Sequence, residues 1–187
     1  MGEVILSEFV TLDGVMQDPG GGGEFEHGGW QVPFFDDDLD AYAQEVLAEA
    51  DALLLGRVTF EEFAQAWPSV TDDTGFADRM NSMSKFVAST TLSEPLGWNA
   101  TLIRGDVANE VRELKEDHTL LINGSGQLVQ TLMRAGLIDD FRIWVHPVVV
   151  GAGKRLFTEG TGFAGMELKG TRTTGRGIVI LELEAAR

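Results

Sequence analysis

Short apolar segments alternate with longer amphipathic segments along most of this sequence, and that order restricts the fold more than any other feature. Five of the apolar segments are EVILSEFV at 3–10, DALLLG at 51–56, KFVAS at 85–89, ATLIRG at 100–105 and HTLLINGSG at 118–126. Strands that are apolar on both faces are typical of parallel sheets covered by helices on both sides. The alternation therefore predicts an α/β fold with a mostly parallel central sheet.

The segments between these strands have helical signals. Asp36, Asp37 and Asp38 suit a helix N-terminus, where carboxylates meet the positive end of the helix dipole, and Asp106 suits an N-cap in the same way. The apolar residues that follow recur at helical spacing. Gly136 supplies a stop signal for the last helix. The expected helices cover 36–50, 59–67, 76–83, 106–115 and 127–135.

The C-terminal part of the chain has a different pattern. IDDFRIWVHPVVV at 138–150 reads as a strand interrupted at Pro147, because proline cannot donate to a sheet ladder. Two later strands at 166–173 and 178–184 are joined by the turn residues TTGRG at 173–177, which is typical of a hairpin. We therefore expect antiparallel strands to be added at the C-terminal end of the sheet.

Composition excludes several classes of protein. The chain has 187 residues, 43% of them hydrophobic, and we expect one domain spanning 1–187. The absence of cysteine excludes disulfides, thiol nucleophiles and thiolate metal sites. The formal charge of −16 opposes binding to nucleic acid or anionic membranes. With no basic region at the N-terminus and no apolar run near the roughly 20 residues that cross a bilayer, we expect a cytoplasmic protein.

Three junctions between an expected strand and an expected helix contain glycine. They are Gly56–Thr59, Arg104–Asp106 and Asn123–Gly126. Glycine lets a ligand approach the backbone, and the first turn of a helix offers unpaired N–H groups to an anion. Arg57 and Arg104 add full positive charges. The junctions predict a phosphate-bearing ligand along one edge of the sheet, although glycine and threonine are also ordinary helix punctuation.

The familiar phosphate and metal motifs do not fit. GSGQLV at 124–129 has two of the three glycines of the dinucleotide fingerprint, and GAGKRL at 151–156 lacks the early glycine of a P-loop. The three histidines are scattered, with no pair at metal-ligand spacing, so no metal site is predicted. No serine lies in the context of a nucleophile elbow.

Four segments carry a family resemblance: TLDGVMQDP at 11–19, LLLGRVTFEEF at 53–63, KFVASTTL at 85–92, and the long block from LLINGSG to KRLF at 120–157. Together they resemble the dihydrofolate reductase superfamily, and especially the reductase domain of the bacterial riboflavin-pathway deaminase-reductase. The resemblance covers about Val4 to Leu183. It implies a dihydrofolate-reductase-like three-layer sandwich and an NADPH-dependent reductase without the deaminase half.

The resemblance also implies where the cofactor binds. Arg57 would contact the 2′-phosphate of NADPH, and Thr59 would lie on the pyrophosphate. The other implied cofactor-binding residues are Gly56, Ser89, Thr90, Arg104, Gly124, Ser125 and Gly126. A guanidinium suits a phosphate in so acidic a chain and favours NADPH over NADH. The alternative is that Arg57 pairs only with Glu61 along its own helix, at i,i+4 spacing.

Reduction by direct hydride transfer also needs a proton donor. Dihydrofolate reductases use a carboxylic acid on the first helix, five residues after a tryptophan that precedes a proline. Trp30 and Pro33 hold this W-x-x-P pattern, but Phe35 occupies the acid position and Asp36 comes one residue late, a rotation of ~100° on a helix. Asp36 is therefore either the catalytic acid or only a cap. Asp13, in the loop after the first strand, is either a second candidate or a turn residue.

The substrate is expected to be a small heterocycle, first an aminouracil ribityl or ribosyl phosphate and second a pterin or folate. Trp30 lines its pocket or belongs to the core. Lys154, with Arg155, would hold a substrate phosphate, or else lies in solvent or at a subunit contact. The glycines at 20–23 allow that loop to close as a lid, or form a disordered tip.

Two further expectations concern activity and assembly. A non-catalytic NADPH-binding or interaction protein on the same fold is the rival function, because fold does not determine function. Phe141 and Trp144 fall on opposite faces of the long strand at 138–150, which predicts that one of them is exposed. We expect a homodimer, the commonest soluble oligomer.

Overall fold

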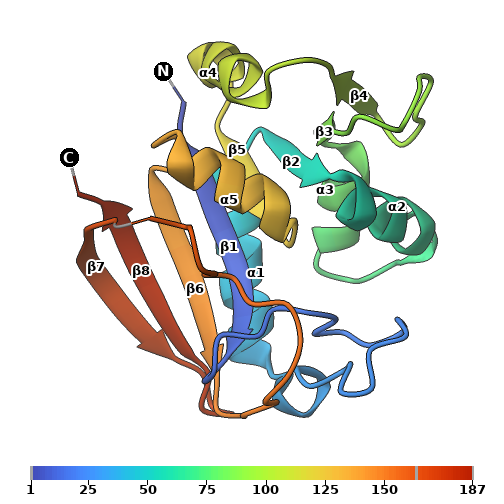
Figure 1. Cartoon of the computed structure of the whole chain (residues 1–187). Coiled ribbons are helices and arrows are strands. Elements are labelled where there is room, and N and C mark those ends of the chain that lie inside the picture. The colour runs from blue at the N-terminus through green and yellow to red at the C-terminus, as the bar shows by residue number, and fades with distance from the viewer. Residues whose placement is uncertain (1, 163, 187) are drawn as a thin grey trace.

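The computed structural model describes residues 2–162 and 164–186 of the chain, and their strands form one sheet (Figure 1). The eight strands lie in the order β4-β3-β2-β5-β1-β6-β8-β7. Their bounds are β1 Val4–Thr11, β2 Ala52–Gly56, β3 Ser84–Ala88, β4 Ala100–Ile103, β5 Leu120–Asn123, β6 Asp140–His146, β7 Met166–Thr173 and β8 Val179–Ala185.

The pairing of the strands confirms the mostly parallel sheet. β1 runs parallel to β5 and β6 on either side of it, and β2, β3 and β4 extend the parallel part beyond β5. β8 runs antiparallel to both β6 and β7, as the hairpin signal at the C-terminal end predicts. Each parallel connection returns the chain to the same end of the sheet, so all six parallel strands end at one edge.

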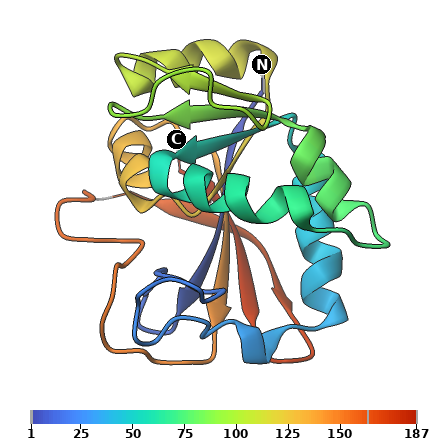
Figure 2. The same ribbon diagram turned by 90° about the vertical axis from the view of Figure 1, so that its right-hand side faces the viewer.

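Helices cover both faces of the sheet, and Figure 2 shows α1 and α5 on opposite sides of it. The α-helices are α1 Asp37–Glu49, α2 Arg57–Ala66, α3 Phe76–Ser82, α4 Val107–Asp117 and α5 Gly126–Arg134, with 3₁₀ turns η1 at Val32–Phe34 and η2 at Trp67–Ser69. This is the expected three-layer sandwich. None of the helices in the described ranges is long and apolar enough to span a membrane.

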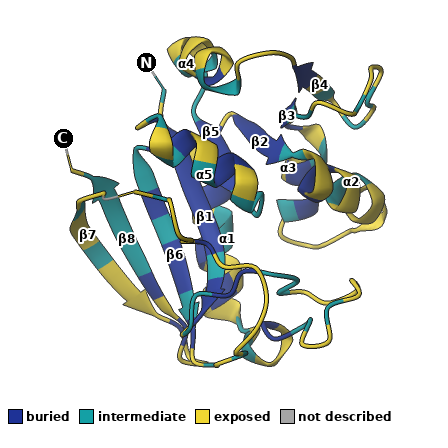
Figure 3. Cartoon of the chain, in the orientation of Figure 1, coloured by how far each residue is buried: buried dark blue, intermediate teal, exposed yellow. Residues whose placement is uncertain are grey.

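Alternation along β1 explains the two apolar layers. Val4 and Leu6 point toward α4 and α5, whereas Ile5 between them points toward α1, α2 and α3. Because successive side chains of a strand leave opposite faces, an all-apolar strand can supply both layers at once. Figure 3 shows the result, with the central strands buried and the edge strand β7 largely exposed.

Helix ends follow the local signals closely. Asp36 accepts the backbone N–H of Leu39, and Asp106 accepts those of Ala108 and Asn109, so both predicted N-caps are confirmed. Helix α2 begins at Arg57, two residues earlier than predicted. Gly56 is its N-cap, in an extended conformation with φ −81° and ψ 164°.

The expectation that Phe141 or Trp144 is exposed is wrong, since their exposed fractions are only 3% and 1%. Strand β6 is an inner strand between β1 and β8, and each of its faces is covered. Phe141 packs in the layer under α4 and α5, and Trp144 packs in the layer under α1. Opposite faces of an inner strand are both interior in a three-layer fold.

Candidate functional site

The predicted phosphate-binding residues gather at the edge where the parallel strands end. The residues that follow the strand ends, in spatial order across the sheet, are Arg104 after β4, Ser89 and Thr90 after β3, Arg57 after β2, and Gly124 after β5. They are far apart in sequence and become neighbours because of the strand order. In open α/β sheets, ligands bind outside the carboxyl ends of the strands.

Two of the glycine junctions are joined to each other by hydrogen bonds. Thr59 Oγ1 accepts the backbone N–H of Ser125 at 3.1 Å and its hydroxyl at 3.0 Å. The backbone N–H of Gly56 donates to the Ser125 hydroxyl at 2.8 Å. The start of α2 and the start of α5 are therefore held together as one unit. Both helices direct unpaired N–H groups toward the same edge.

Gly124 has a strict steric role in this unit. Its φ is 63°, and a Cβ there would lie 3.0 Å from Thr59 Oγ1 and 3.2 Å from Thr59 Cγ2. Ser125 also adopts a left-handed φ of 63°, which is uncommon for a residue with a side chain. Contacts with Thr59 stabilise the turn. Any larger residue at Gly124 would press on the Thr59 side chain and displace the turn.

Arg57 forms the helix pair that the sequence left as the alternative. Its Nη1 lies 2.7 Å from Oε2 of Glu61, and the two side chains are 44% and 47% exposed. An exposed i,i+4 pair is worth only about 0.3–0.5 kcal/mol. Arg57 can therefore exchange Glu61 for a phosphate at little cost.

The outer part of the edge is more open. The Ser89 hydroxyl accepts the backbone N–H groups of Thr91 and Leu92, which makes it a turn residue, and Thr90 is exposed. Arg104 is exposed and forms no salt bridge within the described part of the chain. These residues lie over the strands beside β2, where a ligand extending from Arg57 would reach them.

The loop after β1 is tied to the segment after β6, and Figure 1 shows the two running together at the foot of the sheet. Val15 and Arg155 form an antiparallel bridge. The backbone N–H of Met16 donates to the carbonyl of Lys154, and that of Leu156 donates to the carbonyl of Gly14. The two segments thus form one structural unit beside the glycine junctions.

Asp13 anchors this pair of segments. Its carboxylate accepts the Thr11 hydroxyl at 2.6 Å and the backbone N–H groups of Val150 and Gly151 at 3.2 and 2.8 Å. These hydrogen bonds, that of Thr11 first, lower the pKa of Asp13 to about 2. Asp13 is therefore ionised near neutral pH, and its contacts fit the turn interpretation better than proton donation.

Gln17 joins the two predicted substrate-binding residues. The Trp30 indole N–H donates to the Gln17 carbonyl at 2.8 Å, and the Lys154 backbone N–H donates to the Gln17 side chain at 3.0 Å. Trp30 is buried, whereas Lys154 is exposed. The centre of the Trp30 ring lies 5.0 Å from that of the His146 ring.

Glu62 of α2 interacts electrostatically with two other segments of the site. Burial and the charge of Asp18 raise the pKa of Glu62, and the charge of Lys154 lowers it in part. Asp18 belongs to the loop after β1 and Lys154 to the segment after β6, so both segments face α2. Charges from two distant parts of the sequence therefore act on the middle of α2.

Asp36 lies elsewhere. One of its oxygens accepts the backbone N–H of Leu39 at 2.9 Å, and the other accepts that of Arg176 at 2.8 Å. The β7–β8 turn thereby docks onto the start of α1, where Gly175 also donates to Asp38 at 2.9 Å. Asp36 is occupied as a cap and is not brought together with the glycine junctions.

The sequence model of the RibD C-terminal domain matches residues 3–180. The chain belongs to the RibD C-terminal domain family. This family assignment agrees with the resemblance found in the sequence.

Relatives of this RibD-type chain include proteins of similar length. The Bacillus subtilis (strain 168) protein YyaP is 31% identical over 181 residues, which is 94% of this chain and 91% of YyaP. A structure from Shewanella sp. PV-4, named for riboflavin biosynthesis, has a TM-score of 0.78 at 20% identity with both chains fully covered. The Thermotoga maritima deaminase/uracil reductase has a TM-score of 0.65 at 15% identity, over 99% of this chain and 57% of that one. The two solved structures share the fold.

Two buried titratable groups of the chain were not predicted from the sequence. Glu8 on β1 is 4% exposed, and His146 at the end of β6 is fully buried. Neither Glu8 Oε2 nor His146 Nε2 has a hydrogen-bond partner within the described residues. An acid inside the apolar run EVILSEFV was a visible signal for Glu8. The aromatic surroundings of His146 are nonlocal, so no sequence signal existed for it.

Proposed function

We propose that this RibD C-terminal domain protein is an NADPH-dependent reductase that transfers a hydride to a small heterocyclic substrate. The observation that carries the proposal is the joined pair of glycine junctions, in which Thr59 binds Ser125 and Ser125 binds Gly56. Two helix starts directed at one place favour a ligand with more than one phosphate, and a dinucleotide supplies a pyrophosphate.

The cations of the edge support NADPH as the dinucleotide. We call Gly124–Gly126 the cofactor loop and assign it to the pyrophosphate. Arg57 is assigned to the 2′-phosphate, with Ser89, Thr90 and Arg104 beyond it. In a chain of charge −16, a phosphate needs cations concentrated nearby, and an exposed guanidinium provides a bidentate partner.

The substrate is proposed to bind on the other side of the cofactor loop, near Trp30 and Lys154. The Thermotoga maritima relative is named for reducing a phosphoribosylamino uracil. Lys154 and Arg155 are exposed cations on the segment after β6, and such cations suit a substrate phosphate. We therefore propose an aminouracil carrying a ribosyl or ribityl phosphate as the first substrate to test. The proposed catalytic roles of Asp13 and Asp36 remain predictions, and the contacts of both residues favour structural roles.

The test is a fluorescence titration followed by an activity assay. Four tryptophans provide the signal for NADPH binding, and loss of NADPH absorbance with an aminouracil ribosyl phosphate or a pterin reports turnover. We expect saturable binding and steady NADPH oxidation with one of these substrates. Binding without turnover across the substrate panel would favour a non-catalytic cofactor-binding protein. No binding at any concentration up to millimolar would contradict the proposal.

We also propose that the protein is a homodimer. The edge strand β7 is largely exposed, with Leu168 60% accessible, and its outer backbone groups are free to pair with another copy. Light scattering should give a mass twice that of the chain. A monomer mass at micromolar concentration would contradict this prediction.

A further inference from the structure

Glu8 is a buried acid that the proposed chemistry leaves unused. The pairing of Ser7 with Asn123 places Glu8 beside Gly124, the first residue of the cofactor loop. The backbone amide of Gly124 hydrogen bonds to its carboxyl group. Its other polar atom, Oε2, is buried without a partner in the described part of the chain. The carboxyl group thus lies next to the first residue of the cofactor loop.

The surroundings of Glu8 on the sheet are apolar. Glu8 pairs with Ile143 of β6 and shares its face with Val145, Leu6 and Val10. The charged or titratable residues of β6 pair with Ile5, Ser7 and Thr11 of β1 and therefore point to the opposite face; they are Asp140, Arg142 and His146. β5 has no titratable residue.

Charged groups on the other bordering elements are distant, paired or exposed. Arg134 lies at the far end of α5, eight residues or about 12 Å from its start. Lys115 of α4 binds Asp139, and the other charged side chains of α4 are exposed. Those of the adjoining loops are Asp13, which is ionised and hydrogen-bonded, Asp18, which accepts the Gly23 amide, and the exposed Glu24, Glu26, His27, Lys154, Arg155 and Glu159. No neighbouring charge contributes to the pKa of Glu8.

Burial therefore dominates the titration of Glu8. It raises the pKa to about 8 from an ordinary value of 4.5, and hydrogen bonds from the Gly124 and Phe9 amides offset part of this effect. Between these two values the native state holds a proton that the unfolded state has released. Protein stability linked to Glu8 is thus complete below about pH 4.5 and is lost as the pH rises through about 8.

We propose that Glu8 is a positioning residue of the cofactor loop: its uncharged carboxyl group supports the Gly124 amide, and loss of its proton opposes the binding of an anionic ligand at Gly124–Gly126. This inference rests on the proposed function for the identity of the ligand. A carboxylate beside the loop would repel a pyrophosphate bound to the loop. This repulsion would be strong because the protein interior has a low dielectric constant and screening there is weak. Binding and proton loss therefore compete.

Coupling of this kind has a measurable pH profile. The NADPH titration is run from pH 7 to 9.5, above the second pKa of the 2′-phosphate, which is about 6. Above the pKa of Glu8, which is about 8, the NADPH dissociation constant of the native protein should rise with pH, by up to roughly tenfold for each pH unit. The isosteric variant Glu8→Gln keeps an uncharged acceptor for Gly124, so its dissociation constant should change less than about twofold over the same range.

Lys85 makes Glu8→Gln the necessary control, because burial lowers the pKa of Lys85 to about 8, in the same window. Lys85 lies at the start of β3, away from the cofactor loop, and donates to the carbonyls of Asn81 and Met83. Its titration is present in both proteins. Only the difference between their profiles reports Glu8.

A second measurement requires no ligand. The amide proton and nitrogen shifts of Gly124, followed by NMR from pH 6 to 9.5, should titrate with Glu8 in the native protein and remain flat in Glu8→Gln. A Gly124 amide that does not titrate in the native protein would overturn the inference. Parallel pH profiles of NADPH binding in the two proteins would also overturn it.

The two measurements separate this inference from the proposed function. If NADPH fails to bind at every pH while Gly124 still titrates, the assignment of the cofactor and the ligand half of the inference are both wrong, and the contact between Glu8 and the loop is supported. If NADPH binds with identical profiles, the proposed cofactor is retained and the role of Glu8 is rejected.

Discussion

Replacing Arg57 by alanine should weaken NADPH binding by about 1.5–3 kcal/mol, or about 10- to 150-fold, and leave NADH binding nearly unchanged. The guanidinium is half-exposed at the start of α2, and its pair with Glu61 is easily exchanged. Only NADPH has the 2′-phosphate that this residue is proposed to bind. Parallel fluorescence titrations of the two cofactors measure the difference directly.

Two matched variants make this result specific. Arg112→Ala removes the same charge from an exposed position on α4, where Arg112 bonds only to Asn109 among the residues described, and it should leave both affinities within about twofold. Glu61→Ala frees Arg57 from its helix pair, so NADPH should bind slightly more tightly. Equal losses for NADPH and NADH in Arg57→Ala would show that Arg57 does not bind the 2′-phosphate.

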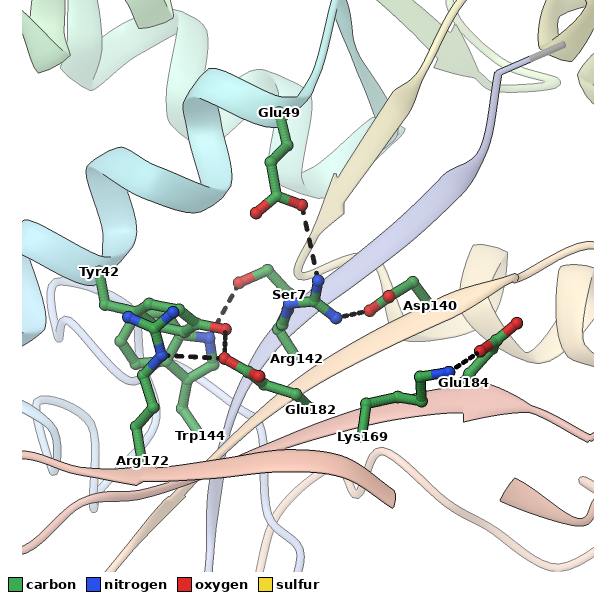
Figure 4. A network of polar contacts seen from close by, with 10 residues as sticks. All are labelled: Ser7, Tyr42, Glu49, Asp140, Arg142, Trp144, Lys169, Arg172, Glu182 and Glu184. Atoms are coloured by element: carbon green, nitrogen blue, oxygen red, sulfur yellow. Dashed lines mark hydrogen bonds and ion pairs between the residues drawn. The ribbon is translucent and has the colours of Figure 1, made fainter. Parts of the chain in front are cut away.

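Replacing Trp144 by alanine should lower the free energy of unfolding by about 3–5 kcal/mol. Trp144 is 1% exposed, and its indole N–H donates to the Ser7 hydroxyl at 3.0 Å. Its ring lies 4.9 Å from that of Tyr42, whose hydroxyl donates to Glu182 (Figure 4). Removing the indole leaves a cavity between β6 and α1, which the surrounding strands can fill only in part.

Urea unfolding followed by circular dichroism at 222 nm measures this change. Leu12→Ala in the loop after β1 is the control, because Leu12 is 64% exposed and lies outside the proposed dimer edge, and it should change stability by less than about 0.5 kcal/mol. A loss below about 1 kcal/mol for Trp144→Ala would show that the layer under α1 repacks around the missing ring.

Local patterns predicted most elements of the fold, because their causes are local. The apolar run EVILSEFV needs only a strand that is buried on both faces, and the caps at Asp36 and Asp106 need only the next three residues. The family resemblance added the order of the layers and the roles of Arg57 and Thr59. The prediction that Phe141 or Trp144 is exposed to solvent was wrong. Both side chains are buried because β8 pairs with β6 and makes it an inner strand.

Nonlocal contacts account for what could not be predicted at the site. The joining of Thr59 to Ser125 links residues 66 positions apart, and no pattern in either segment reports it. The Thr11 hydroxyl lowers the pKa of Asp13 most, and the amides of Val150 and Gly151 lower it further, so part of this effect depends on a segment that lies far along the chain. Side-chain roles of this kind can be assigned only when the partner residue is known.

The sequence by itself determined the α/β class, the helix starts and the glycine junctions, since hydrophobic period, capping and backbone freedom act over a few residues. Tertiary structure alone decided that two junctions interlock through Thr59 and that Glu8 lies beside Gly124. Strand order decides which strand ends become neighbours. Burial then shifts the pKa of each acid and so decides whether it is charged.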